Sequence, residues 1–273
     1  MNQDIISKII NQDYASITDK IEEFIEKQIE KNQAKGIILG LSGGIDSAVL
    51  AYICKRKLKE KTLALIMPDT TITPSIETED AMKIIGLTGI EHKLIDIKPI
   101  VNEYSMYLEP NEKAKGNLRA RVRTNILYYY ANIKNYLVLG SSDKSEYLIG
   151  YFTKFGDGAS DLTPISSLYK LQVREIAKHL EIPENIISKK SSPHLWKDHE
   201  VNLAHILHGL RVPSFPESQH RHRHCLPIFP QYFRLQADFP STPAVGLLHQ
   251  YPAPLGRYQL PYLPQQQLTD PIP

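Results

Sequence analysis

The 273-residue sequence has few cysteines and no long hydrophobic run. Its two cysteines, Cys54 and Cys225, are far apart and form no CxxC pair, which excludes a disulfide scaffold and fits a reducing compartment. No apolar stretch approaches the roughly 20 residues that cross a bilayer, and the charged N-terminus is not a signal peptide. The formal net charge of +2 gives no reason to expect a nucleic-acid partner. We therefore predict a soluble, cytoplasmic protein that binds neither a membrane nor a nucleic acid.

The last quarter of the chain has no lysine at all. Lysine occurs 22 times in residues 1–197 and never afterwards, whereas eight of the ten histidines and 12 of the 19 prolines lie in 194–273. So many prolines exclude long helices and central strands. Two interpretations stay open, a disordered proline-rich tail and a reading-frame change near Glu200, and resequencing the gene would separate them. We predict one organised domain over 1–197 and an irregular, proline-rich tail over 198–273.

The organised part alternates short apolar runs with amphipathic segments, which indicates βαβ units and an α/β fold with a parallel sheet. The predicted strands cover residues 36–41, 62–68, 91–97 and 136–142. The predicted helices cover residues 17–29, 47–58, 73–87, 117–135 and 168–182. In such sheets ligands bind beyond the carboxyl ends of the strands. Residues 40–47 and 141–146 both follow a strand, so we expect them to share one site.

The stretch GLSGGIDSAV, residues 40–49, lies between the first predicted strand and a helix. Its glycines allow positive φ and a close approach of the backbone to a ligand. Free N–H groups at the start of the helix and the helix dipole favour an anion, and Ser42 and Ser47 could add hydroxyl donors. The stretch lacks the lysine of the usual P-loop, and a simple helix N-cap is the plainer alternative. We interpret it as a phosphate-binding loop.

Asp46 is an unusual residue for such a loop, because a carboxylate repels phosphate unless a cation lies between them. Mg²⁺ typically binds through one or two carboxylates together with phosphate oxygens of the substrate. Glu146 follows another predicted strand and would supply the second carboxylate. The pair predicts Mg²⁺ bound together with a pyrophosphate group.

The motif SGGIDS, residues 42–47, resembles the signature of the N-type ATP pyrophosphatases, which cleave ATP between its α and β phosphates and form an adenylate. Further segments at 116–123, 140–166, 168–183 and 191–196 resemble, in order, the ammonia-dependent NAD synthetases, so that the resemblance covers some three quarters of the chain. It implies an adenine-nucleotide alpha-hydrolase-like fold, with helices on both faces of the parallel sheet. It also implies the last step of NAD biosynthesis, in which ATP and ammonia convert deamido-NAD into NAD, AMP and pyrophosphate through an acyl-adenylate.

The resemblance also implies individual roles and a homodimer. The residues that it implies for binding ATP are Gly40, Leu41, Ser42, Gly43, Gly44, Ile45, Asp46, Ser47, Ser141, Lys170 and Ser192. Those for deamido-NAD are Arg121, Lys154 and Asp161, and those for Mg²⁺ are Asp46 and Glu146. The catalytic set is Asp46, Lys170 and Asp161, with Asp161 as the base that removes a proton from ammonia.

Plainer roles remain open for several of these residues. The arginines of residues 119–123 could form a solvated helix face, Lys154 could be a surface lysine, and Glu146 could cap its own helix. The family also has a His-Lys pair near its C-terminus that helps bind deamido-NAD, and this sequence has none. The alternatives are therefore a catalytically impaired ATP-binding remnant of the family and another ligase of the same superfamily.

Overall fold

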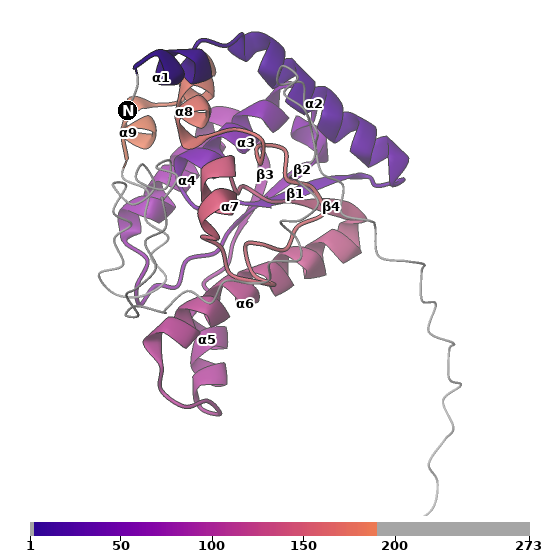
Figure 1. Ribbon diagram of the computed structural model, residues 1–273. Helices are drawn as coiled ribbons and strands as arrows, with labels where there is room; N and C mark the ends of the chain where they lie inside the picture. The colour runs from indigo at the N-terminus through magenta and orange to yellow at the C-terminus, as the bar shows by residue number, and fades with distance from the viewer. Residues whose placement is uncertain (1–2, 190–273) are drawn as a thin grey trace, which may run out of the picture.

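The computed structural model describes residues 3–189, shown in colour in Figure 1. The predicted tail over 198–273 and the predicted ATP ligand Ser192 lie outside this part. The four strands are β1 (Gly36–Gly40), β2 (Thr62–Ile66), β3 (Glu91–Leu94) and β4 (Tyr136–Leu139). The helices are α1 (Gln3–Ile10), α2 (Tyr14–Lys31), α3 (Ile45–Lys57), η1 (Lys59–Lys61), α4 (Ser75–Thr88), α5 (Lys98–Ser105), α6 (Glu112–Lys134), α7 (Lys144–Ile149), α8 (Lys170–His179) and α9 (Glu184–Ile187).

The four strands form one parallel sheet in the order β3-β2-β1-β4. The chain builds outward from β1 through β2 to β3 and then returns to add β4 on the other side of β1. The strand order therefore reverses between β1 and β4. In open α/β sheets this reversal opens a crevice at the carboxyl ends of the strands, where ligands bind.

Both faces of the sheet are covered by helices, as Figure 1 shows. Ile37 and Leu39 of β1 point into a core shared with α2, α3, α4, α8 and α9. Ile38, between them, points into a second core shared with α5 and α6. All three side chains are buried because alternate residues of a central strand face opposite sides. The predicted α/β class, with a parallel sheet between two helical layers, is confirmed.

All the predicted strands and helices are present, although several are shorter or longer than expected. The third strand was predicted over 91–97 but ends at Leu94, and its four residues are exposed because β3 is an edge strand. The short helices α5, α7 and α9 were not predicted, since eight residues or fewer give too little of a helical period to recognise. Among residues 3–189, no helix combines the length and the apolar character needed to cross a membrane.

Candidate active site

The phosphate loop, residues 40–47, joins the carboxyl end of β1 to the N-terminus of α3. Gly43 has φ +81°, and a Cβ built there would lie 2.3 Å from a backbone carbonyl oxygen of α4, so only glycine fits. Ser47 Oγ donates to the Gly44 carbonyl at 3.0 Å and accepts from the Ser42 N–H at 3.2 Å. These bonds close the loop over the start of α3, where unpaired N–H groups favour an anion.

The loop side chains differ in what they offer a ligand. Leu41 and Ile45 are buried in the core, so only their backbone atoms can reach a nucleotide. Ser42 is exposed, whereas Ser47 is buried and its hydroxyl is engaged within the loop. Asp46 is half-buried in the first turn of α3. The loop therefore offers a ligand mainly its backbone N–H groups, together with the carboxylate of Asp46.

Lys170, the first residue of α8, joins the loop to the segment after β4. Its Nζ lies 2.8 and 2.7 Å from the two carboxylate oxygens of Asp46 and 3.2 Å from Glu146 Oε1. It also lies 3.0 Å from Oδ2 of Asp143, a carboxylate that is fully buried. We call these four residues the Lys170 cluster. The structure thus brings together three residues that the sequence assigned to one site, although 124 positions separate Asp46 from Lys170.

Two helix starts hold the Lys170 cluster in place. At α7, the Glu146 N–H donates to Asp143 Oδ1 at 2.9 Å, and the Asp143 N–H donates to Glu146 Oε2 at 3.4 Å, which is a capping box. At α8, the Lys170 N–H donates to Ser145 Oγ at 3.1 Å. Glu146 therefore fills the plainer role of a helix cap with one oxygen and faces Lys170 with the other.

The charges of the Lys170 cluster are unbalanced, because one lysine faces three carboxylates. Burial raises the pKa of Glu146 to about 7, and Asp46 and Asp143 add to the rise, against Lys170, which lowers it. Burial also raises the pKa of Asp46, although Lys170 opposes the shift. Burial by itself would lower the pKa of Lys170, but the carboxylates outweigh it and raise that pKa. At neutral pH the lysine is charged and Glu146 is close to its midpoint.

The donor set of the Lys170 cluster suits a hard cation such as Mg²⁺. Between residues 3 and 189, no group of three or more His, Cys, Asp or Glu side chains is arranged to hold a metal ion unaided. Mg²⁺, however, commonly takes one or two carboxylates and completes its coordination with phosphate oxygens and water. Asp46 and Glu146 are two such carboxylates, and they lie at the predicted phosphate loop. The residues present therefore fit Mg²⁺ only together with a phosphate ligand.

The residues predicted to bind deamido-NAD lie at α6 and after β4. Arg121 Nε donates to the backbone carbonyl of Lys154 at 3.2 Å, so the Arg121 side chain lies against the backbone of Lys154. Asp161 Oδ2 accepts from the Val138 N–H of β4 at 2.7 Å, and its Oδ1 accepts from the Tyr128 hydroxyl at 3.2 Å. Burial raises the pKa of Asp161 despite these two hydrogen bonds. The structure thus pairs Arg121 with Lys154 and anchors Asp161 to the strand beside the crevice.

The alternative of a solvated arginine face on α6 is wrong for Arg119. This side chain is 2% exposed, and its Nε donates to Asp69 Oδ2 at 2.7 Å in an equally buried ion pair. Arg123 Nε donates to the Met67 carbonyl at 2.8 Å. Both arginines therefore tie α6 to the carboxyl end of β2, and only Arg121 of the three is exposed. Ser141, directly after β4, is half-buried.

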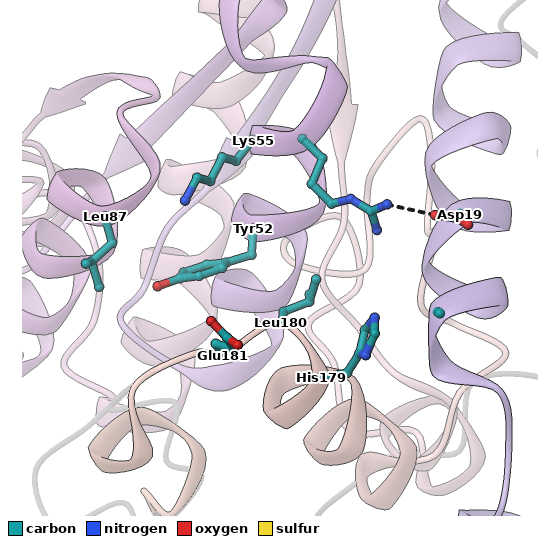
Figure 2. A pocket seen from close by; sticks show the side chains of 9 residues that line it. Asp19, Tyr52, Lys55, Leu87, His179, Leu180 and Glu181 are labelled. Atoms are coloured by element: carbon teal, nitrogen blue, oxygen red, sulfur yellow. Dashed lines mark hydrogen bonds and ion pairs between the residues drawn. The ribbon is translucent and has the colours of Figure 1, made fainter.

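A cavity of about 650 Å³ lies away from these residues and is shown in Figure 2. Tyr52 and Lys55 come from the end of α3, and His179 and Glu181 from the end of α8. Both helices start at the crevice, so this cavity lies at their opposite ends. Since α8 rises about 1.5 Å per residue, His179 is roughly 13 Å along the helix from Lys170. The predicted site residues therefore lie at the crevice, and none of them lines this cavity.

The doubly wound sheet and its phosphate loop at the switch point define an α/β nucleotide-binding protein. A family model described as NAD synthase matches residues 17–203. The chain belongs to the NAD synthase family, which confirms the resemblance found in its motifs.

Individual relatives agree with this assignment. The chain is 50% identical over 194 residues to the NH(3)-dependent NAD(+) synthetase of Hyperthermus butylicus, with 70% of each chain covered. Among solved structures it is similar to the NH3-dependent NAD synthetase of Campylobacter jejuni in complex with the nitrate ion, with TM-score 0.63 and 42% identity over 65% of this chain and 78% of that one. It is also similar to the NMN synthetase of Francisella tularensis, with TM-score 0.68 and 35% identity over 73% of this chain and 87% of that one.

Two residues of the site were missed by the sequence interpretation. Asp143 carried a signal, because Asp three positions before Glu146 is the spacing of a capping box. Lys189, described below, carried none, since its contacts lie 112 and 146 positions away in the chain.

Proposed function

We propose that the protein is an ammonia-dependent NAD synthetase, which makes NAD from deamido-NAD. The nicotinate carboxylate attacks the α-phosphate of ATP, which forms an acyl-adenylate and releases pyrophosphate. Ammonia then attacks the acyl carbon, loses one proton and displaces AMP, which leaves the amide. Membership of the NAD synthase family and relatives named NH(3)-dependent NAD(+) synthetase support this reaction.

The observation that carries the proposal is the contact between Lys170 and the phosphate loop. Charge in this reaction develops on phosphate oxygens, so fixed cations and oriented N–H groups stabilise the transition state most. Lys170, the first residue of α8, is buried and charged, and its backbone N–H is held by Ser145 Oγ of α7. It is therefore available to balance the phosphates of ATP when these occupy the loop.

The remaining roles are those that the family resemblance implies. The phosphate loop, Ser141, Lys170 and Ser192 would bind ATP, and the exposed cations Arg121 and Lys154 would bind the anionic dinucleotide. Asp161 would accept the proton of the attacking ammonia, because a carboxylate with a raised pKa is a better base.

Asp46 and Glu146 would hold Mg²⁺ against the phosphates of ATP. When bound, the ion would neutralise the pyrophosphate and make it a better leaving group. Below about pH 7 Glu146 takes up a proton, so its contribution as a ligand weakens there.

A homodimer is the assembly that the surface supports. A mainly apolar groove of about 360 Å³ runs between α5 and α6, lined by Ile95, Ile100, Asn125, Ile126, Tyr129 and Tyr130. Elsewhere on these two elements, Tyr107, just after α5, and Ile133 of α6 are 78% and 64% exposed. An exposed apolar surface of this kind commonly marks a protein interface, and we assign it to a second copy of the chain.

The test is a coupled assay of pyrophosphate, AMP and NAD with ATP, Mg²⁺, deamido-NAD and ammonium, in which each component is left out in turn. We expect turnover only with all four present. Pyrophosphate release that ignores deamido-NAD would point to another ligase of the superfamily. ATP binding without any release of pyrophosphate would point to an impaired remnant.

Two comparisons sharpen this assay. Lys170→Met should lower kcat about 100-fold or more. Lys178→Met, which changes an exposed lysine on the same helix that pairs with Glu175, should leave kcat unchanged. Nicotinate mononucleotide should be tested beside deamido-NAD, because one similar structure is an NMN synthetase. A preference for the mononucleotide would overturn the proposed substrate while leaving the chemistry intact.

A further inference from the structure

Lys189 lies against the outer side of the phosphate loop. Its Nζ donates to the Gly43 carbonyl at 3.3 Å and to Glu77 Oε2 at 3.1 Å, and it forms an ion pair with Asp80. The side chain is 19% exposed, and Asp80 is 4% exposed. A lysine just past the end of α9 thus binds both the loop and the first two turns of α4.

Helices α4 and α9 are joined by a second set of hydrogen bonds that does not include the phosphate loop. Asn185 of α9 donates through Nδ2 to Asp80 Oδ1 at 3.0 Å, and its Oδ1 accepts from Lys83 Nζ of α4 at 3.2 Å. Lys83 therefore links α4 to α9 as Lys189 does. Only Lys189 of these two lysines contacts the phosphate loop.

The contact with Gly43 fixes the orientation of a peptide group in the loop. In a planar trans peptide the C=O and the following N–H point in opposite directions. The Gly43 carbonyl points outward to Lys189, so the Gly44 N–H on the same peptide points inward, where it donates to Ser42 Oγ at 3.2 Å. Gly44 is the N-cap of α3, which is where an anion would bind.

We propose that Lys189 is a positioning residue for the phosphate loop, which holds the Gly43–Gly44 peptide with its N–H turned toward the phosphates of ATP. The proposal rests on the proposed function, because it needs ATP as the ligand of the loop.

The experiment compares Lys189→Met, Lys189→Arg and the matched control Lys83→Met. It measures the dissociation constant of a non-hydrolysable ATP analogue by calorimetry, the KM for ATP and for deamido-NAD, kcat, and the melting temperature. We expect Lys189→Met to weaken ATP binding about tenfold or more, as the loss of a charged hydrogen bond predicts, with a change below about threefold in the KM for deamido-NAD. Lys189→Arg should recover part of the affinity, and Lys83→Met should keep it within about twofold.

Other outcomes decide against the proposal. Lys189→Met could lower the melting temperature as Lys83→Met does and still bind ATP like the wild type. In that case Lys189 only stabilises the contact between α4 and α9. Should Lys189→Met fail to fold, Glu77→Gln carries the test, because it loosens the lysine from α4 without touching the loop. Unchanged ATP affinity in Glu77→Gln then contradicts the proposal, and a weakening of about threefold supports it. Wild-type protein that binds no ATP would instead refute the proposed function.

Discussion

Single residues in the Lys170 cluster perform two tasks at once. Glu146 caps α7 through Oε2 and faces Lys170 through Oε1, and Asp143 caps the same helix while it faces the same lysine. Burial raises the pKa of Glu146 to about 7, and the neighbouring carboxylates, which one cation does not balance, add to the rise. The residues that shape the local backbone thus also set the charge that a nucleotide would meet.

The titration of Glu146 should be visible in the stability of the ligand-free protein. Its pKa is about 7 in the folded state and near 4.5 in the unfolded state, so between these values the folded state binds more protons. Its contribution to the free energy of unfolding therefore falls as pH rises from about 4.5 to 7, by no more than about 1.4 kcal/mol per pH unit. Glu146→Gln removes this term but keeps an oxygen for the capping box.

The measurement is urea unfolding of both proteins at pH 5, 6, 7 and 8 in metal-free buffer. Relative to the wild type, Glu146→Gln should gain stability as pH rises toward 7, and the difference should level off above it. Parallel pH profiles for the two proteins would show that Glu146 titrates alike in the folded and unfolded states.

At the scale of elements, the phosphate loop is held by three parts of the chain: the β1–α3 unit that contains it, helix α4 and Lys189. β1 and α3 enclose it, and the first turn of α4 lies so close that a Cβ at Gly43 would overlap its backbone. Lys189 closes the remaining side. The loop conformation therefore depends on α4 and α9 as well as on its own glycines.

Gly43→Ala should disable the loop and leave the rest of the fold in place. The left-handed conformation costs an L-residue about 1–2 kcal/mol, and the new Cβ would lie 2.3 Å from a carbonyl oxygen of α4. We expect ATP affinity to fall about tenfold or more in calorimetry. Gly86→Ala is the control, because its Cβ meets nothing within 4 Å in the interior of α4 and should add about 0.5–1 kcal/mol of stability. Equal ATP affinity in the two variants would contradict the account of the loop.

The elements also show how far the sequence could predict the structure. The strands, the long helices and the phosphate loop follow from local patterns, so periodicity and glycine placement predicted them. Lys189 acts through contacts across the fold, and the buried Arg119–Asp69 pair joins positions 50 apart. Such contacts depend on the order of strands in the sheet, which no local pattern specifies. The pairing of Asp46 and Glu146 was predicted because both follow strands, and their shared lysine came from the family resemblance alone.

Within residues 3–189, an exposed apolar surface lies outside the two cores. It lies on α5 and α6, on the side of the sheet away from α3 and α8 (Figure 1). The groove between these helices and the exposed Tyr107 and Ile133 would be costly to leave in water. A second copy of the chain would bury them and place two α6 helices, each with its Arg121, at the same interface.

Charges placed on this surface should separate the proposed dimer. Tyr129→Lys combined with Ile133→Glu replaces two side chains that are 63% and 64% exposed, so the fold of the monomer should persist. Sedimentation velocity should show a dimer for the wild type and a monomer for this variant. Ile76→Glu, at a position on α4 that is 50% exposed, is the control and should remain dimeric. A wild type that sediments as a monomer at every concentration would refute the dimer.

The contact between Asp46 and Lys170 also has a consequence for how the protein is made. The two residues stand 124 positions apart, and a ribosome adds about 5–20 residues per second. Roughly 6–25 s therefore pass between the synthesis of the aspartate and that of its lysine. β1, the loop and α3 are neighbours in sequence and can form early, whereas contacts of such long separation form late. Each new chain thus carries the residues of its phosphate loop for several seconds before the lysine exists, and the Lys170 cluster forms only after α8 has docked.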